Sequence, residues 1–276
     1  MTAALEVEHL GVRYGGVVAI DDVSLVVPAG AISGLIGPNG AGKTSFLDAV
    51  SGFASPTTGR VRLDGRACDG LGPHDYARAG LARTFQSLEL FDDLTVEENL
   101  VVAATRPRWW SVLRDLFGPG RPTAALSDAI DDAVTLCSLS DLVRRMPSEL
   151  SNGERHRVAL ARAMVAQPSV LLLDEPGAGL DPTETGELGD LLRGVADRGT
   201  AVLLVDHDMA LVLGTCELVH VLDRGRLIAS GTPSEVRDDP VVLTAYLGTA
   251  HLGTTSSGPV SNGPDGPLGP VAGGGA

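Results

Sequence analysis

The sequence predicts an α/β fold with three parts: an N-terminal antiparallel β subdomain, a core of parallel strands and helices, and an inserted α-helical subdomain. Two alternating, β-branched stretches at 5–15 and 17–27 open the chain. Short continuous apolar runs at 170–174 and 201–206 are typical of parallel strands buried on both faces. Between about 88 and 167 helical segments predominate, which indicates the insertion.

The remaining elements follow from local patterns along the chain. A short apolar strand at 31–36 leads through a glycine-rich turn into a helical pattern that starts at Lys43 and ends near Val50. A further strand is expected at 60–63, after a turn rich in Pro, Thr and Gly. A helix at 184–198 separates the two buried strands. This alternation of strand, loop and helix favours a parallel sheet.

The domain organisation is predicted to be simple. Residues 1–248 form one domain, and residues 249–276 form a disordered tail because they are rich in Gly and Pro and lack apolar periodicity. The stretch at 106–122 is interpreted as an insertion that holds Trp109 and Trp110. It is either an amphipathic helix that packs both rings into a local core or an exposed aromatic and basic contact surface.

Composition excludes several classes of protein. The chain has 276 residues, 43% of them hydrophobic, so a sizeable core can be buried. Lys plus Arg number 21 and Asp plus Glu 35, and the net charge of −14 disfavours nucleic acid as a partner. No apolar run approaches about 18 residues, and the N-terminus lacks a secretory pattern. Cys68, Cys137 and Cys216 have no metal-like spacing and are expected to be reduced core residues.

One motif carries the strongest chemical signal. The chain has twenty arginines and one lysine, Lys43. Residues 37–44, which include this lysine, match G-x-x-x-x-G-K-[ST] between a strand and a helix. Such a P-loop turns backbone N–H groups toward phosphate oxygens, the lysine contacts the β- and γ-phosphates, and the Thr44 hydroxyl ligates Mg²⁺. The sequence therefore predicts a P-loop NTPase core. Its ATP-binding residues are Gly37, Pro38, Asn39, Gly40, Ala41, Gly42, Lys43, Thr44 and Ser45.

Two carboxylates end a predicted buried strand. Asp174 is placed to hold Mg²⁺ through its water shell, and Glu175 to orient or deprotonate the attacking water. Acidic residues also end strands as helix caps, and the P-loop favours the catalytic interpretation over that one.

A helix start at Ser151 allows two interpretations. Ser151 and Glu154 fit a capping box, which explains the segment without any ligand. Alternatively, the same helix end serves as a phosphate site for a nucleotide held mainly by another subunit.

The motifs, in this order over about 5–248, resemble an ATP-binding-cassette (ABC) ATPase, in which the segment at 150–154 is the family signature. The resemblance covers nearly the whole predicted domain. It implies functional roles for residues whose type alone would not indicate a function. Tyr14 would stack on adenine, Gln86 in Arg83-Thr84-Phe85-Gln86 would contact Mg²⁺ and water, Asp181 would lie in a loop crossing to the partner's site, and His207 would touch the γ-phosphate.

The signature departs from the usual Leu-Ser-Gly-Gly-Gln. Asn152 replaces the first glycine and Glu154 the glutamine, whereas Ser151 and Gly153, which the resemblance implies do most of the phosphate work, are kept. The Glu154 carboxylate near a polyanion should weaken a site that depends on the helix dipole, although a capping box would turn it back from the ligand. We expect an active site.

Within the family, the chain is similar to the ATPases of branched-chain amino-acid importers. The similarity lies in PHDYARAGLARTFQ at 73–86, the long insertion, LLVDHDM at 203–209 and SGTPSEVRDDPVVLTAYLG at 230–248. It implies a peripheral subunit on the cytoplasmic face of the cell membrane. Its partners would be integral-membrane permease subunits, a second ABC ATPase subunit (identical or homologous) and a substrate-binding protein. The alternatives are a soluble non-transport ABC ATPase and a nucleotide-dependent clamp with weak turnover.

Overall fold

The computed structural model describes residues 2–84, 90–104 and 124–251. Three sequence predictions lie outside these ranges: Gln86, the insertion with Trp109 and Trp110, and the tail from residue 252 onward. Helix α10 (Pro240–His251) continues three residues past the predicted domain end at 248. None of the helices in the described ranges combines the length and the apolar composition that a membrane span requires.

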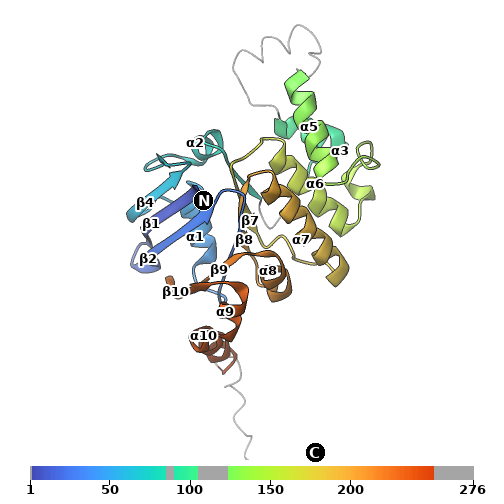
Figure 1. The fold of residues 1–276 in the computed structure, drawn as a ribbon. Helices are drawn as coiled ribbons and strands as arrows, with labels where there is room; N and C mark the ends of the chain where they lie inside the picture. The colour runs from blue at the N-terminus through green and yellow to red at the C-terminus, as the bar shows by residue number, and fades with distance from the viewer. Residues whose placement is uncertain (1, 85–89, 105–123, 252–276) are drawn as a thin grey trace, which may run out of the picture.

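A parallel sheet forms the centre of the described structure (Figure 1). Its strand order is β10-β9-β3-β8-β7-β6, and every neighbouring pair except β9 and β10 is parallel. The predicted buried strands are confirmed as β7 and β8, whereas β6, β9 and β10 were not predicted. The strands are β3 (Ile32–Ile36), β6 (Leu81–Thr84), β7 (Val170–Asp174), β8 (Ala201–Val205), β9 (Leu218–Asp223) and β10 (Arg226–Gly231).

The N-terminal residues form a second, antiparallel sheet with the order β2-β1-β4-β5. Leu5 and Val7 of β1 are buried on either side of the less buried Glu6, as the alternating pattern predicts, and the alternation shifts at an irregularity between Val7 and Leu10. This sheet confirms the antiparallel β subdomain. Its strands are β1 (Ala3–Tyr14), β2 (Val17–Pro28), β4 (Thr58–Leu63) and β5 (Arg66–Ala67).

Helices flank the parallel sheet, and α3, α5 and α6 contact one another as a helical region. Helix α6 begins at Asn152 because the Ser151 hydroxyl accepts a hydrogen bond from the Glu154 N–H, while the Glu154 carboxylate accepts one from the Ser151 N–H. The predicted capping box is therefore confirmed. The other helices are α1 (Lys43–Val50), α2 (Pro73–Arg78), α3 (Val96–Ala104), α5 (Ala124–Leu136), a 3₁₀ turn (Pro147–Glu149), α7 (Pro182–Asp197), α8 (Met209–Thr215) and α9 (Pro233–Asp238); α6 ends at Met164.

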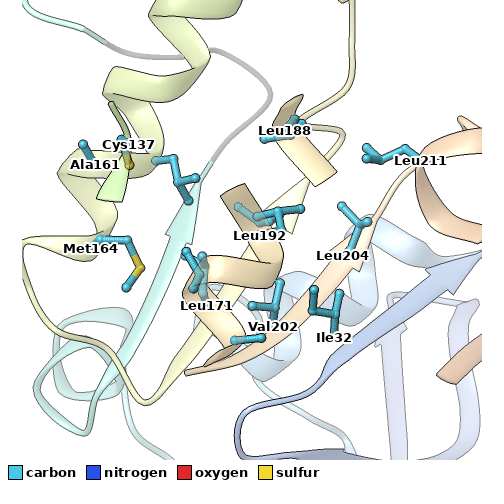
Figure 2. Packing of buried hydrophobic residues seen from close by; sticks show 14 of the residues in the cluster. Ile32, Cys137, Ala161, Met164, Leu171, Leu188, Leu192, Val202, Leu204 and Leu211 are labelled. Atoms are coloured by element: carbon cyan, nitrogen blue, oxygen red, sulfur yellow. The ribbon is translucent and has the colours of Figure 1, made fainter. Parts of the chain in front are cut away.

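Two hydrophobic cores lie on opposite faces of the parallel sheet. Because side chains alternate along a strand, Leu171 and Leu173 of β7 join one core, whereas Val170 and Leu172 join the other. Figure 2 shows the first core, where strand residues such as Leu171 face Leu192 of α7. The second core packs the antiparallel sheet and α1 against the parallel sheet. Burial on both faces explains why β7 and β8 are continuously apolar.

The three cysteines are free and buried, as predicted. Burial raises the pKa of the Cys137 and Cys216 thiols to about 12, so both remain protonated at neutral pH. Cys137 lies in the first core beside Ala161 and Met164 (Figure 2).

A buried histidine makes the fold sensitive to acid. His220 of β9 is 3% exposed, and its Nδ1 lies 2.9 Å from the Ser230 hydroxyl of β10. Burial lowers the pKa of His220 to about 4, because the charged ring would lose its hydration. Between pH 6.5 and 4 the unfolded chain binds this proton and the folded chain does not, so stability falls as the pH falls.

We predict that His220→Leu flattens the pH dependence of stability over this window. From pH 7 to pH 5 the histidine removes about 2 kcal/mol from the free energy of unfolding of the wild type. Urea unfolding of both chains at the two pH values measures the difference, and other titrating groups cancel between them. Equal pH dependence in the two chains contradicts the prediction.

Candidate functional site

The predicted phosphate loop and the predicted acidic residues meet at one edge of the parallel sheet. Leu35 of β3 pairs with Val205 of β8, and Val205 pairs with Asp174 of β7. Because these strands are parallel and in this register, the loops that follow them leave the sheet at the same level. The register brings Lys43, Asp174 and Glu175 together, although more than 130 residues of sequence separate the lysine from the carboxylates.

Glycines shape the loop between β3 and α1. Gly37 has φ +154°, and a Cβ there would lie 2.0 Å from the Leu222 carbonyl oxygen. Gly42 has φ +105°, and a Cβ there would lie 2.6 Å from the Ala19 carbonyl oxygen. Both contacts are far shorter than a carbon side chain tolerates, so the loop needs glycine at these two positions. Asn39 and Gly40, at the tip of the loop, are exposed.

The start of α1 presents backbone donors together with the Lys43 ammonium. No described side chain caps this helix, whose N-cap is Gly42, so its first N–H groups are available to an anion. Lys43 is 9% exposed and its Nζ donates to the carbonyl oxygens of Gly37 (2.7 Å) and Pro38 (3.2 Å). Burial lowers the pKa of Lys43, and the carboxylates of Glu175 and Asp174 oppose that shift.

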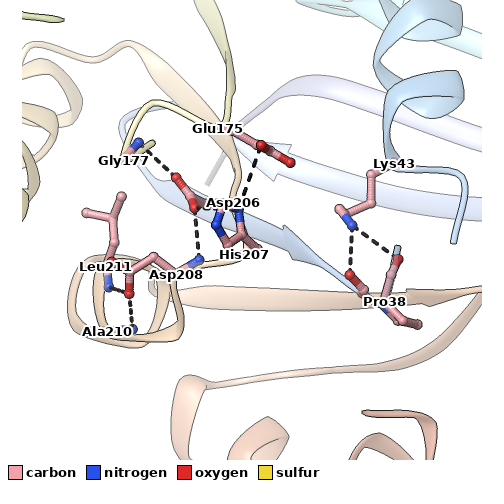
Figure 3. Close-up of polar contacts among 10 residues, drawn as sticks. Pro38, Lys43, Glu175, Gly177, Asp206, His207, Asp208, Ala210 and Leu211 are labelled. Carbon is pink, nitrogen blue, oxygen red and sulfur yellow. Dashed lines mark hydrogen bonds and ion pairs between the residues drawn. The ribbon is translucent and has the colours of Figure 1, made fainter. Parts of the chain in front are cut away.

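Glu175 and His207 point toward each other (Figure 3). His207 Nδ1 lies 3.7 Å from the Glu175 carboxylate and 3.6 Å from that of Asp206. The backbone of Glu175 has φ +50°, and its N–H donates to the Val205 carbonyl oxygen at 2.7 Å. A side chain with Cβ rarely adopts this conformation, and such strained positions cluster at functional sites.

A buried aspartate holds the loops around this pair. Asp206 is fully buried, and its carboxylate accepts hydrogen bonds at 2.9 Å from the N–H groups of Gly177 and Asp208. It therefore ties the segment after Glu175 to the segment that carries His207. The motif Val205-Asp206-His207-Asp208 contained this residue, but the sequence alone did not show that it would be buried.

Arg83 is a second residue whose role sequence reasoning missed. Its guanidinium, 5% exposed, donates to Asp48 of α1 at 2.7 Å and to Asp174 at 3.1 Å (side-chain exposures 32% and 16%). It also donates to the Ser51 hydroxyl at 3.1 Å. This arginine links α1 to the end of β7, so it fixes the predicted Mg²⁺ residue relative to the phosphate loop. Its place three residues before Gln86, in Arg83-Thr84-Phe85-Gln86, was the available signal.

The signature segment is joined to the loop before α7. The Asn152 side-chain amide donates to the Gly179 carbonyl oxygen at 2.9 Å, and the Gly153 N–H donates to Glu184 at 3.2 Å. Asp181 is the N-cap of α7 and accepts hydrogen bonds from the N–H groups of Thr183 and Glu184. The contact from Glu184 was not predicted, although Asp181 and Glu184 have capping-box spacing.

Of the remaining predicted site residues, Tyr14 and Thr44 are exposed in the structure, and Gln86 is not described by it. Tyr14 ends β1 and is 49% exposed, and Thr44 at the start of α1 is exposed. Gln86 lies outside the described residues. The structure thus brings the phosphate loop, Asp174, Glu175 and His207 to one edge, and the contacts of Tyr14 and Gln86 with ligand stay predictions.

The fold and the phosphate loop define an ATP-binding cassette, and comparisons with known proteins agree. The family model described as "ABC transporter" matches residues 20–178, and the model described as "Branched-chain amino acid ATP-binding cassette transporter" matches residues 226–252. The chain therefore belongs to the ABC transporter family of ATP-binding subunits, which are nucleotide-binding ATPases. This confirms the expected family and fold.

Comparison with individual relatives shows which members of the family this chain resembles. The chain is 41% identical to the high-affinity branched-chain amino acid transport ATP-binding protein LivG of Salmonella typhimurium, and 39% identical to BraF, of the same description, from Pseudomonas aeruginosa. Each alignment covers 88% of this chain and 97% of the relative. A solved ATP-binding cassette of an ABC transporter in its ADP conformation superposes with a TM-score of 0.79 at 26% identity, covering 90% of this chain and all of that one.

We predict that Arg83→Met destabilises the fold. Removing the guanidinium leaves the Asp48 and Asp174 carboxylates unpaired, which should lower the free energy of unfolding by about 2–4 kcal/mol. Chemical denaturation measures the change. Arg78→Met is the matched control, because Arg78 is exposed and its ion pair with Asp75 is 3.9 Å long, so its effect should stay below about 0.5 kcal/mol. Equal effects of the two substitutions would refute the role given to Arg83.

Proposed function

We propose that this chain is the ATP-binding and hydrolysing subunit that powers an ABC importer of branched-chain amino acids or similar small polar solutes. The observation that carries the proposal is the shared sheet edge, which brings the phosphate loop with its buried Lys43 ammonium together with the carboxylates of Asp174 and Glu175 and with His207. The match over residues 226–252 and the names of the relatives support an importer of this cargo class. They favour it over the two alternatives, a soluble non-transport ABC ATPase and a nucleotide-dependent clamp with weak turnover.

The phosphate loop supplies the binding energy for the triphosphate. The N–H groups at the start of α1 and of the loop donate to phosphate oxygens, and the helix dipole favours their negative charge. Lys43 already lies against the loop through its bonds to Gly37 and Pro38, so its charge is positioned before the phosphates arrive. Tyr14 would contribute a stacking surface for adenine.

The residues at the sheet edge also fit Mg²⁺. Thr44 offers a hydroxyl oxygen and Asp174 a carboxylate oxygen, which are hard donors of the kind this ion prefers. Together with phosphate oxygens and water they would hold the ion, and Gln86 would join them. When bound, Mg²⁺ would neutralise part of the negative charge on the phosphates.

Glu175 is the proposed general base. Its carboxylate accepts a proton from the attacking water, whose oxygen forms a bond to the γ-phosphorus while the bond to the ADP oxygen breaks. The products are ADP and inorganic phosphate. His207, close to Glu175, would contact the γ-phosphate, and the buried Asp206 holds the two loops in register.

The site requires a second ATPase subunit, identical or homologous. Each nucleotide would lie between the P-loop of one subunit and the residues Ser151, Asn152, Gly153 and Glu154 of the other, with Asp181 in the loop crossing between them. Closure around nucleotide and reopening after hydrolysis would drive an integral-membrane permease, supplied by a substrate-binding protein. We place the subunit peripherally on the cytoplasmic face of the cell membrane, with no nucleic acid as a partner.

We predict that Glu175→Gln binds ATP but hydrolyses it at less than about 1% of the wild-type rate, because the amide accepts no proton from water. The unhydrolysed nucleotide should then hold two chains together. Phosphate release and sedimentation velocity with Mg-ATP measure the two effects. Lys43→Ala is the control that should lose binding itself, and a Glu175→Gln chain that stays monomeric at saturating ATP argues against the two-subunit site.

We further predict that deleting the gene from the source cells reduces uptake of labelled leucine, isoleucine and valine. Wild-type chain supplied from a plasmid should restore uptake, whereas the Glu175→Gln chain should not, because transport needs turnover. Uptake of labelled glucose serves as an internal reference. Unchanged uptake of all three amino acids would rule out this cargo class while leaving the ATPase proposal intact.

A further inference from the structure

One carboxylate joins the starts of two helices that belong to different parts of the fold. Glu184 Oε2 accepts a hydrogen bond from the Asp181 N–H at 3.1 Å, and Oε1 accepts one from the Gly153 N–H at 3.2 Å. The first bond belongs to the start of α7 in the core, and the second to the start of α6 in the helical region (Figure 1). The Asn152 amide, bonded to the Gly179 carbonyl oxygen at 2.9 Å, strengthens the same junction.

The local electrostatics explain why a carboxylate lies there. Both helix N-termini carry partial positive charge, and Glu184 is near both, so its negative charge is favoured twice. The glycine at 153 permits the approach, because a Cβ at that position would lie 2.7 Å from Glu184 Oε1. Glu154, the other carboxylate at this helix end, is directed back to the Ser151 N–H by its capping box. Among the residues that the structure describes, the Gly153 N–H therefore has Glu184 as its side-chain acceptor.

Under the proposed function, on which this inference rests, the same N–H faces a phosphate of the nucleotide bound by the opposite subunit. A carboxylate and a phosphate are both anions and both need this donor. They cannot share it, because two negative groups at hydrogen-bond distance from one amide repel each other. The phosphate has to displace Glu184 Oε1 before the two subunits close.

We propose that Glu184 is an internal competitor for the phosphate site at the signature helix, so that it opposes closure until nucleotide takes its place. Displacement need not disturb α7, because the bond from Oε2 to the Asp181 N–H and the Asp181 cap can remain. The contact also restrains the helical region against the core. Arrival of nucleotide thus removes the Gly153–Glu184 bond between the helical region and the core, while the bond from Asn152 to Gly179 can remain.

The test is Glu184→Gln in the full-length Glu175→Gln chain. Glutamine retains the capping box of α7 and the length of the side chain but removes the negative charge. The concentration of Mg-ATP at half-maximal dimer formation, measured by sedimentation velocity, should fall by roughly two- to fivefold. Glu187→Gln removes the same charge from an exposed position one turn along α7 and should leave that concentration unchanged.

Two further measurements separate the outcomes. Urea unfolding should show a small fall in the midpoint of the Glu184→Gln chain relative to its parent, because the charge near two helix N-termini is lost, together with easier dimer formation. A merely structural role would lower the midpoint and weaken dimer formation. An unchanged or higher ATP requirement overturns the competitor role. If the Glu175→Gln parent itself forms no dimer with Mg-ATP, the proposed function fails and this inference fails with it. A parent that dimerises while Glu184→Gln changes nothing refutes the inference alone.

Discussion

The register of the buried parallel sheet is the constraint on which the site depends. Strands β3, β8 and β7 lie side by side in parallel, and the pairing of Val205 with both Leu35 and Asp174 fixes how far each one extends. A slip of one residue would turn the alternating side chains to the opposite cores and move every following loop. The two hydrophobic cores therefore stabilise the register, and the register in turn places the phosphate loop against the carboxylates.

At the sheet edge that carries the site, cationic and acidic side chains lie close to one another. Lys43 is buried beside Asp174 and Glu175, and these carboxylates oppose the loss of its charge on burial. Arg83 contributes a second cation, held by Asp48 and Asp174. Asp174 therefore interacts with two cations, and Arg83 ties it to α1. This arrangement keeps the acidic residues ordered in a site whose substrate is itself a polyanion.

At the start of α6, acidic side chains accept hydrogen bonds from backbone N–H groups instead of pairing with cations. Its capping box directs Glu154 to Ser151, and the carboxylate of Glu184 reaches across to Gly153. The departures from the usual signature sequence thus have local structural roles: Glu154 caps the helix, and Asn152 binds the loop before α7. Neither role requires ligand, yet both concern the surface that the proposed second subunit would use.

Sequence patterns were sufficient for the local features of this protein: the phosphate loop from Gly37 to Thr44, the buried strands predicted at 170–174 and 201–206, and the capping box of Ser151 and Glu154. Each depends on residues close together in the chain, so spacing and residue type are sufficient. Long-range packing, in contrast, was needed to show that Arg83 joins Asp48 to Asp174, that Asp206 is buried, and that Glu184 accepts a hydrogen bond from Gly153. These contacts span between 29 and 91 residues. They arise from strand order and helix packing, which no short sequence pattern encodes.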